Sequence, residues 1–243
     1  MQTLRIATWN IHKGVNGLGP TRRLEIHNLA QGVEALDADV VCLQEVRKFN
    51  AREAKRFAQW PPQPQADVLA PAGYHAVYAS NARTRFGEHG NALLSRWPVL
   101  AHAHKDVSDH RFEQRGLLHA QLSLYDTTVH VVVLHLGLLG GSRLRQVAAL
   151  SHYLAEHVPP DAPLVVAGDL NDWAERLHEP MRRMGLRTLE GVRLPTFPSR
   201  LPMLHLDRVY ARHLRCAHAM VPRGPAWARM SDHLPLVMTL EAL

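Results

Sequence analysis

Cysteine is scarce in this sequence of 243 residues, which contains only Cys42 and Cys216. Two cysteines far apart in the chain, without the spacing of zinc ligands, support neither a disulfide framework nor a thiolate metal site. Cys42 lies inside the apolar run ADVVCLQEV, where a small core residue is the expected role. Any metal chemistry therefore has to come from other side chains.

Long apolar runs are absent as well. No stretch approaches the roughly 18 residues of a membrane-spanning helix, and the opening MQTLRIATWNIHKG lacks the basic and apolar regions of a secretory signal. We therefore expect a cytoplasmic protein without a transmembrane segment. Hydrophobic residues make up 46% of the chain and charged residues 21%, which is typical of a globular protein with a full core.

Positive charge is only slightly in excess. The chain has 28 Lys and Arg against 22 Asp and Glu, a formal net charge of +6. This balance favours partners that carry phosphate, such as nucleic acid or an anionic membrane surface. The basic residues are scattered along the chain, so charge alone does not define a binding patch.

Apolar runs typical of strands alternate with helical patterns. Strands are predicted at 4–11, 38–45, 74–79, 91–95, 116–124, 129–136, 163–170, 206–211 and 234–240. Helices are predicted at 21–36 and 142–157, and a third is predicted to begin at Asp172, which has a capping-box partner in Glu175. The proline-containing segments 60–73 and 191–203 indicate surface loops. Together these patterns predict one domain, 1–243, with two mixed sheets packed face to face and helices outside.

Polar side chains stand at the ends of many predicted strands. These residues are Asn10, Glu45, His135, Asp169 with Asn171, Asp207, and Asp232 with His233. Each one alone has an ordinary structural interpretation, as a turn residue, a helix cap or a hydrogen-bonded core histidine. As a set, carboxylate and amide oxygens without thiolates suit Mg²⁺ or Mn²⁺, and a histidine beside an aspartate can stabilise charge on a phosphate. The set therefore predicts metal-assisted hydrolysis of a phosphate ester.

The motifs TWNIH, LQEV, GNALLSR, LHLG, GDLND, LDRVY and SDHLPL follow one another in this order between Thr8 and Leu236. The ordered set resembles the endonuclease/exonuclease/phosphatase superfamily, with a fold like that of pancreatic deoxyribonuclease, and the LHLG region is similar to a subgroup of small stand-alone bacterial hydrolases. The resemblance implies a four-layer α/β sandwich, which agrees with the strand and helix pattern.

The resemblance also implies which residues bind the metal. Glu45 would be the principal ligand of Mg²⁺ or Mn²⁺, and Asn10 would assist through the metal or its water. Asp232 would be a further carboxylate on the metal side.

The remaining implied roles concern the phosphate. Asp169 and Asn171 would position and activate the attacking water, and Asp207 would orient His233, which contacts the scissile phosphate. Asp172 is expected to cap the next helix.

Further phosphate contacts are implied at three positions. His135 matches a second catalytic histidine of pancreatic-type deoxyribonucleases, but the matching partner position holds Asn91 instead of glutamate. An amide cannot supply the same charge to an imidazole, so a phosphate-contacting or orienting role is expected for His135. Asn91 and Arg115 are expected on the substrate phosphate, and a surface-strand role for Arg115 is equally open.

Substrate choice is expected in the loops at 60–73, 81–90, 137–143 and 191–203, because one core serves many substrates in this superfamily. The positive charge favours DNA or RNA over a phospholipid head group or an inositol phosphate. A non-catalytic nucleic-acid-binding module is the alternative from another class. Such a module should have lost some of the catalytic residues, yet all of them are present in the sequence: Glu45, Asp169, Asn171, Asp207 and His233. We expect a monomer.

Overall fold

Two β-sheets carry most of the chain in the computed structural model, which describes residues 3–17, 19–124 and 127–242. The six-stranded sheet has the order β12-β13-β1-β4-β6-β5, the five-stranded sheet has the order β11-β10-β9-β8-β7, and β2 pairs with β3. The strand bounds are β1 Thr3–Asn10, β2 Val15–Asn16, β3 Arg23–Leu24, β4 Val40–Asn50, β5 His75–Thr84, β6 Gly87–Ser95, β7 Val99–Asp106, β8 Gly116–Leu124, β9 Thr127–His135, β10 Leu164–Asp169, β11 Asp207–Arg212, β12 Leu214–Met220 and β13 Leu236–Ala242.

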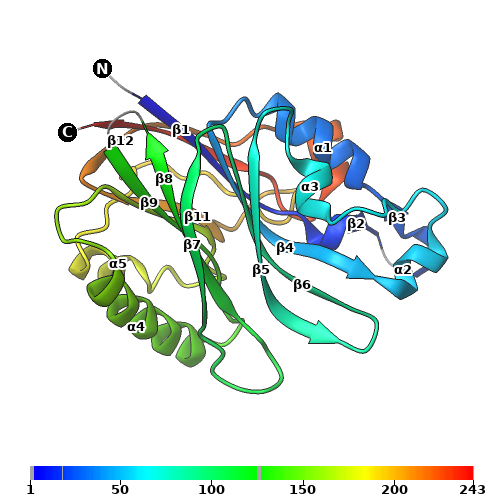
Figure 1. Ribbon diagram of the computed structural model, residues 1–243, viewed down its shortest axis with the longest axis horizontal. Helices are drawn as coiled ribbons and strands as arrows, with labels where there is room; N and C mark the ends of the chain where they lie inside the picture. Colours follow the sequence, from blue (N-terminus) through cyan, green and yellow to red (C-terminus); the bar gives the residue numbers. More distant parts are fainter. Residues whose placement is uncertain (1–2, 18, 125–126, 243) are drawn as a thin grey trace.

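Helices cover the outer face of each sheet, so the fold has four layers (Figure 1). Helices α1 and α3 pack on the six-stranded sheet, and α4 and α5 pack on the five-stranded sheet. This arrangement confirms the predicted four-layer α/β sandwich. The helix bounds are η1 His12–Gly14, η2 Gly19–Thr21, α1 Ile26–Ala35, α2 Ala51–Arg56, α3 Gln65–Leu69, α4 Gly140–His157, α5 His178–Arg183 and α6 Pro225–Met230.

Alternation along the central strands explains why they are apolar on both faces. Val131 and Val133 of β9 point into the core between the two sheets, whereas Val132 and Leu134 pack toward α4. Successive strand side chains point to opposite faces, so a strand covered on both sides must be apolar throughout. Cys42 is fully buried in the same inter-sheet core, as expected.

The predicted strands all correspond to observed strands, whereas the two-residue strands β2 and β3 were not predicted. The longer strands β7 and β12 were not predicted either. Both lie at a sheet edge, and most of their residues are at least partly exposed. An edge strand buries little apolar surface, so its sequence, such as VLAHAHKD in β7, carries no strong strand pattern. The segment 81–90, predicted as a loop, instead forms the turn end of the β5–β6 hairpin.

Two helix predictions need correction. The first helix begins at Ile26, not at residue 21, because Arg23 and Leu24 pair with β2. The helix predicted to begin at Asp172 is absent there, and α5 begins only at His178. Asp172 instead accepts a hydrogen bond from the backbone N–H of Leu177 at 2.8 Å, which holds the preceding turn.

A buried pair of histidines lies beneath α4. His119 of β8 is 2.9 Å from His130 of β9 between ring nitrogens, and its other nitrogen is 3.1 Å from the hydroxyl of Tyr153. Burial lowers the pKa of His119 to about 4, and it also lowers the pKa of His130. Both rings are therefore neutral in the folded protein near pH 7.

Acid should destabilise the protein through this pair. Between about pH 6.5 and 4 the unfolded chain takes up protons at these histidines while the folded protein does not, so stability falls as the pH falls. We expect the free energy of unfolding to drop by about 2 kcal/mol through His119 between pH 7 and 4.5. Urea titrations of the wild type, His119→Gln and the exposed-site control His218→Gln would measure it. An unchanged slope in His119→Gln would contradict this assignment.

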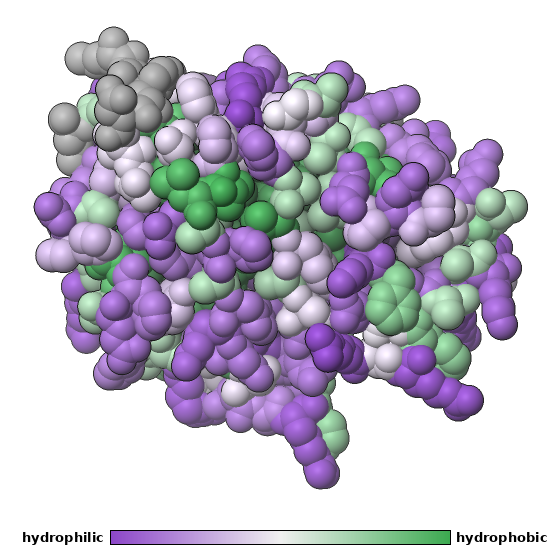
Figure 2. Space-filling view, viewed as in Figure 1, coloured by the Kyte–Doolittle hydropathy of each residue, from purple (hydrophilic) through white to green (hydrophobic). Residues whose placement is uncertain are grey.

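One face of the molecule has few extended apolar areas. Figure 2 shows a mostly hydrophilic face with small apolar patches between polar side chains. Among the described residues, no helix combines the length and the hydropathy needed to cross a membrane.

Candidate functional site

Three of the predicted residues lie side by side because of strand register. Asp169 at the end of β10 pairs with His135 on one side and with Asp207 on the other. All three continue the residues that face the inter-sheet core, so their side chains enter the same space. The sheet edge therefore gathers an imidazole and two carboxylates from three strands.

The residues around Asp169 have backbone conformations that the site requires. A side chain at Gly168 would place its Cβ 1.8 Å from the carbonyl oxygen of Leu134, so only glycine fits there. Asn171 has a left-handed φ of 48°, which asparagine tolerates better than most residues. In this conformation its backbone N–H donates to Asp169 Oδ1 at 2.9 Å, and its side chain donates to the carbonyl of Leu136 at 2.9 Å.

Glu45 reaches the site through an irregularity in β4. The pairing of β4 with β6 shifts register between Leu43 and Val46, and Glu45 has a φ of 58°. Regular alternation would send Glu45 to the face opposite Gln44, which bonds Thr8 between the sheets. A bulge of this kind re-aims one side chain, and it is a feature often found beside functional sites.

The segment before β13 brings His233 against the end of β1. The indole N–H of Trp9 donates to the carbonyl of His233 at 2.9 Å, and the hydroxyl of Ser231 donates to the carbonyl of Asn10 at 2.7 Å. Because β13 runs antiparallel to β1, its first residues meet the last residues of β1. These bonds fix the backbone that carries His233.

Asp169 is the centre of the resulting network. Its Oδ2 accepts a hydrogen bond from Asn10 at 3.1 Å, and it lies 3.4 Å from His135 Nε2 and 3.8 Å from His233 Nε2. The other nitrogen of His233, Nδ1, is 2.7 Å from Asp207 Oδ2. Every one of these side chains is buried.

The two histidines differ in charge. Burial alone would lower the pKa of His233, but the carboxylates of Asp207 and Asp169 outweigh it and raise the pKa to about 10. Burial lowers the pKa of His135 well below its ordinary value, with Arg115 adding to the effect. Burial also raises the pKa of Asp169. At neutral pH His233 is therefore an imidazolium and His135 is neutral.

The Asp169, Asp207 and His233 donor atoms lie within 4.8 Å of one another, a spacing that a metal ion could also bridge. A protonated imidazole has no lone pair for a metal, and Nδ1 of His233 is already committed to Asp207. This trio is therefore better suited to holding a proton than a cation.

The acidic group at Glu45 fits a divalent cation better. Glu45 Oε2 is buried, and the ammonium of Lys13 pairs with it at 3.0 Å. Burial would raise the pKa of Glu45, but nearby positive charge, that of Lys13 first, lowers it, so the group is ionised. A buried, ionised carboxylate oxygen is a donor that a hard cation can use. Asp232 lies within reach of the charge of Glu45 and pairs with His12 at 3.0 Å.

Asn91 and Arg115 are both held by bonds within the protein. The Asn91 side chain is fully buried and donates to the carbonyls of Gly116 and Val133, and its contact with a phosphate stays a prediction. The guanidinium of Arg115 donates to the carbonyl of Leu136 at 3.1 Å and to Glu113 at 3.0 Å. Arg115 thus ties a loop to the segment that follows His135.

Several residues of the site had no clear sequence signal. Lys13 pairs with Glu45 and His12 pairs with Asp232, and both Lys13 and His12 have left-handed φ angles. The hydroxyl of Thr196 donates to Asp207 Oδ2 at 2.5 Å, and the ring of Phe197 lies 4.8 Å from that of His233. The sequence indicated His12 and Lys13 only by their position directly after TWNI. Nothing in the sequence links Thr196 to Asp207.

The fold and the site place the chain among α/β sandwich proteins whose polar site lies at one edge of two facing sheets. Residues 7–233 match the model of the Endonuclease/Exonuclease/phosphatase family, and the chain belongs to this family. As that description states, the family contains nucleases and phosphatases, which are hydrolases of phosphate esters.

Individual relatives agree over the full length. The chain is 33% identical over 242 residues to the uncharacterized protein YbhP of Escherichia coli strain K12, covering 96% of this chain and 94% of YbhP. An endonuclease/exonuclease/phosphatase from Beutenbergia cavernae has a TM-score of 0.79 at 22% identity, covering 100% of this chain and 72% of that one. The D. rerio TDP2 structure with a single-strand DNA product has a TM-score of 0.68 at 17% identity, covering 100% of both chains. At these identities the two structures show a shared fold.

Proposed function

We propose that this protein is a divalent-metal-dependent phosphodiesterase that uses an activated water, acts on nucleic acid, and works as a single domain, 1–243. One observation carries the proposal: an imidazolium, His233, is held between Asp207 and Asp169 in the same site as the ionised Glu45. A phosphate group is the substrate that needs positive charge, a water-binding carboxylate and a cation site together.

His233 would stabilise the negative charge that develops on the phosphate. Its Nδ1 bond to Asp207 fixes the ring, and the Thr196 hydroxyl fixes Asp207 in turn. The Nε2–H then points toward the space beside Asp169, where a phosphate oxygen can accept it. The electrostatic benefit of such a preorganised donor is large because it needs no rearrangement during the reaction.

Asp169 would hold the attacking water. Asn10 and the backbone N–H of Asn171 donate to its two oxygens and fix its plane. Burial raises its pKa, which makes the carboxylate a stronger base for a proton of that water. Neutral His135, 3.4 Å away, would orient the same carboxylate or contact the phosphate.

The cation would be held by Glu45, with Asn10 and Asp232 assisting, and Mg²⁺ or Mn²⁺ matches this set of hard oxygen donors. When bound, it supplies positive charge that polarises the phosphate.

A loop beside the site supports nucleic acid as the substrate. Phe112 is 83% exposed, and the guanidinium of Arg111 lies 4.7 Å from the centre of its ring. Glu113 of the same loop accepts a hydrogen bond from Leu138, which places the loop next to the strand end that carries His135. An exposed ring beside an arginine can stack on a base while the arginine meets the backbone phosphate. TDP2, which shares the fold, is described with a DNA product.

A phospholipid or inositol phosphate is the second candidate substrate. Leu138, Leu139 and Trp173, on the loops that follow His135 and Asp169, are all about half exposed. Exposed apolar side chains at a site edge can also contact an acyl surface.

The substrate is tested with a panel of single-stranded DNA and RNA, plasmid DNA, sphingomyelin, cardiolipin, inositol phosphates and bis-p-nitrophenyl phosphate, with Mg²⁺ or Mn²⁺. We expect turnover of the polynucleotides, and Phe112→Ala should raise their KM about tenfold because a stacked base contributes about 1–3 kcal/mol. The small diester has no neighbouring nucleotide to stack on Phe112, so we expect its turnover to be unchanged.

Leu100→Ala, at an exposed position on β7, is the control and should have no effect. Preferential hydrolysis of a lipid or an inositol phosphate would instead favour the second candidate. An unchanged polynucleotide KM in Phe112→Ala would exclude this loop from binding.

A further inference from the structure

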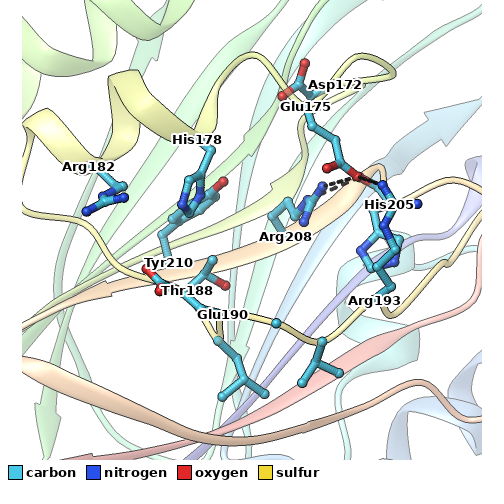
Figure 3. Close-up of a pocket in the computed structure, with 13 residues that line it drawn as sticks. Asp172, Glu175, His178, Arg182, Thr188, Glu190, Arg193, His205, Arg208 and Tyr210 are labelled. Atoms are coloured by element: carbon cyan, nitrogen blue, oxygen red, sulfur yellow. Dashed lines mark hydrogen bonds and ion pairs between the residues drawn. The ribbon is translucent and has the colours of Figure 1, made fainter.

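A pocket of about 590 Å³ lies behind the candidate catalytic site (Figure 3). It is formed by the turn after β10, by α5, by residues 188–193 and by β11. Arg208 lines it, whereas the neighbouring Asp207 points into the catalytic site, so the two sites use opposite faces of one strand. The volume suits a small ligand.

Two buried side chains that line this pocket each have one polar atom without a hydrogen-bond partner among the described residues. Asp172 is 5% exposed and His205 is 8% exposed. Asp172 Oδ2 accepts from Leu177, and His205 Nδ1 accepts from Leu194 at 3.3 Å. In the described part of the chain, neither Asp172 Oδ1 nor His205 Nε2 has a hydrogen-bond partner. Leaving such groups unpaired is costly, so a ligand that pairs them gains affinity.

The unpaired atoms are one acceptor and one donor. Burial lowers the pKa of His205 to about 4, with Arg208 adding to the effect, so the ring is neutral. Because Nδ1 accepts a hydrogen bond, the proton of the neutral ring is on Nε2. Asp172 Oδ1 accepts and His205 Nε2 donates, which is the pairing that hydroxyl groups satisfy.

The charges around the pocket are balanced. Its walls carry the guanidinium groups of Arg182, Arg193 and Arg208 and the carboxylates of Asp172, Glu175 and Glu190. Figure 3 shows Glu175 bridging Arg193 and Arg208, at 3.2 and 3.5 Å. A net positive pocket would attract a free anion, but this balance gives an anion no net attraction. A neutral, polar ligand is favoured instead.

Flat apolar surface is present as well. Tyr210 and His178 lie on the side of the pocket away from His205, with their ring centres 6.1 Å apart. An aromatic wall with alternating acceptors and donors is suited to a ring that has an apolar face and hydroxyl groups on its edge.

We propose that this pocket binds a hydroxyl-rich ring, a sugar or a cyclitol, through adjacent hydroxyl groups. One hydroxyl donates to Asp172 Oδ1, another accepts from His205 Nε2, and the ring face lies against His178, the more exposed of the two aromatic side chains. This site is distinct from the proposed hydrolytic site, and binding there does not depend on catalysis. An adjoining pocket of about 320 Å³ shares Asp172 and His205 and is bordered by Trp173, so a ring attached to a substrate can also enter.

The test is a titration of ¹⁵N-labelled protein with D-mannose, D-ribose and myo-inositol, each followed by NMR, with inorganic phosphate as the contrast. We expect at least one of the three polyols to shift the amide signals of residues 172–178, 188–193 and 205–210. Asp172→Asn and His205→Asn should each weaken binding about tenfold, because the first replaces a charged acceptor by a neutral amide and the second removes the Nε2 donor. Both asparagines keep an acceptor for the backbone N–H that the native side chain holds.

Further variants keep the test independent of folding and of hydrolysis. His218→Gln, at an exposed histidine on β12, should bind the polyol as the wild type does. His233→Gln should bind the polyol normally, so loss of hydrolysis does not affect the result. If mannose 6-phosphate binds more tightly than mannose, the bound ring is part of a phosphorylated substrate. If the two bind equally, the bound ring is a free ligand. No polyol binding, binding that the pocket variants leave unchanged, or shifts with phosphate alone would overturn the proposal.

Discussion

Replacing His233 with glutamine should lower kcat/KM for bis-p-nitrophenyl phosphate by at least about a thousandfold. The imidazolium is buried, its Nδ1 is 2.7 Å from Asp207, and its Nε2 faces Asp169. Glutamine can keep one hydrogen bond but supplies no positive charge where a phosphate would gain negative charge. The effect should fall mainly on kcat, because the charge develops fully only in the transition state.

The control for this variant is His218→Gln, an exposed histidine on β12, which should keep full activity. The circular dichroism spectrum and the metal affinity of His233→Gln should match those of the wild type, because His233 is not placed on the cation. Turnover at the wild-type rate in His233→Gln would refute the assigned mechanism.

The fold was predictable where the strands are buried on both faces. Val131 to Leu134 and Leu164 to Ala167 are continuous apolar runs because one sheet face meets the other sheet and the opposite face meets α4. The edge strands β7 and β12 lack this constraint, because most of their residues contact water and few of them pack in a core. The turn after Asp169 shows another limit, since Asp172 bonds to the backbone of Leu177 without starting a helix there.

The site was predictable to the extent that strand ends meet at one edge. His135, Asp169 and Asp207 each end or begin a strand, and sheet register then sets them side by side. Glu45 was predicted as a carboxylate at a strand end, but the bulge that turns it into the site was not predictable, because regular alternation would point it away. Lys13 and Thr196 depend on loop conformations, and no periodic pattern encodes which side chain such a loop will contact. The unpaired atoms of Asp172 and His205 appear only when tertiary packing is known.

Replacing Glu45 with glutamine should remove the cation and with it the hydrolysis. The ionised oxygen Oε2 is buried and pairs with the ammonium of Lys13 at 3.0 Å. Glutamine keeps the shape of the side chain but loses the charge, so we expect the Kd for Mn²⁺ to rise at least about a hundredfold. Mn²⁺ binding by electron paramagnetic resonance measures this directly, without reference to activity.

The same change should lower hydrolysis of bis-p-nitrophenyl phosphate at least about a thousandfold, and a chelator should do the same to the wild type. Glu156→Gln, at a carboxylate that is 72% exposed on α4, is the matched control and should bind Mn²⁺ normally. If Glu45→Gln bound Mn²⁺ with native affinity, the cation would have to lie elsewhere, and the Asp169, Asp207 and His233 trio would be the next set to test. That outcome would also require His233 to give up its proton, because an imidazolium cannot bind a metal. Metal binding would then release protons in Glu45→Gln, whereas at Glu45, which is already ionised, it should release none.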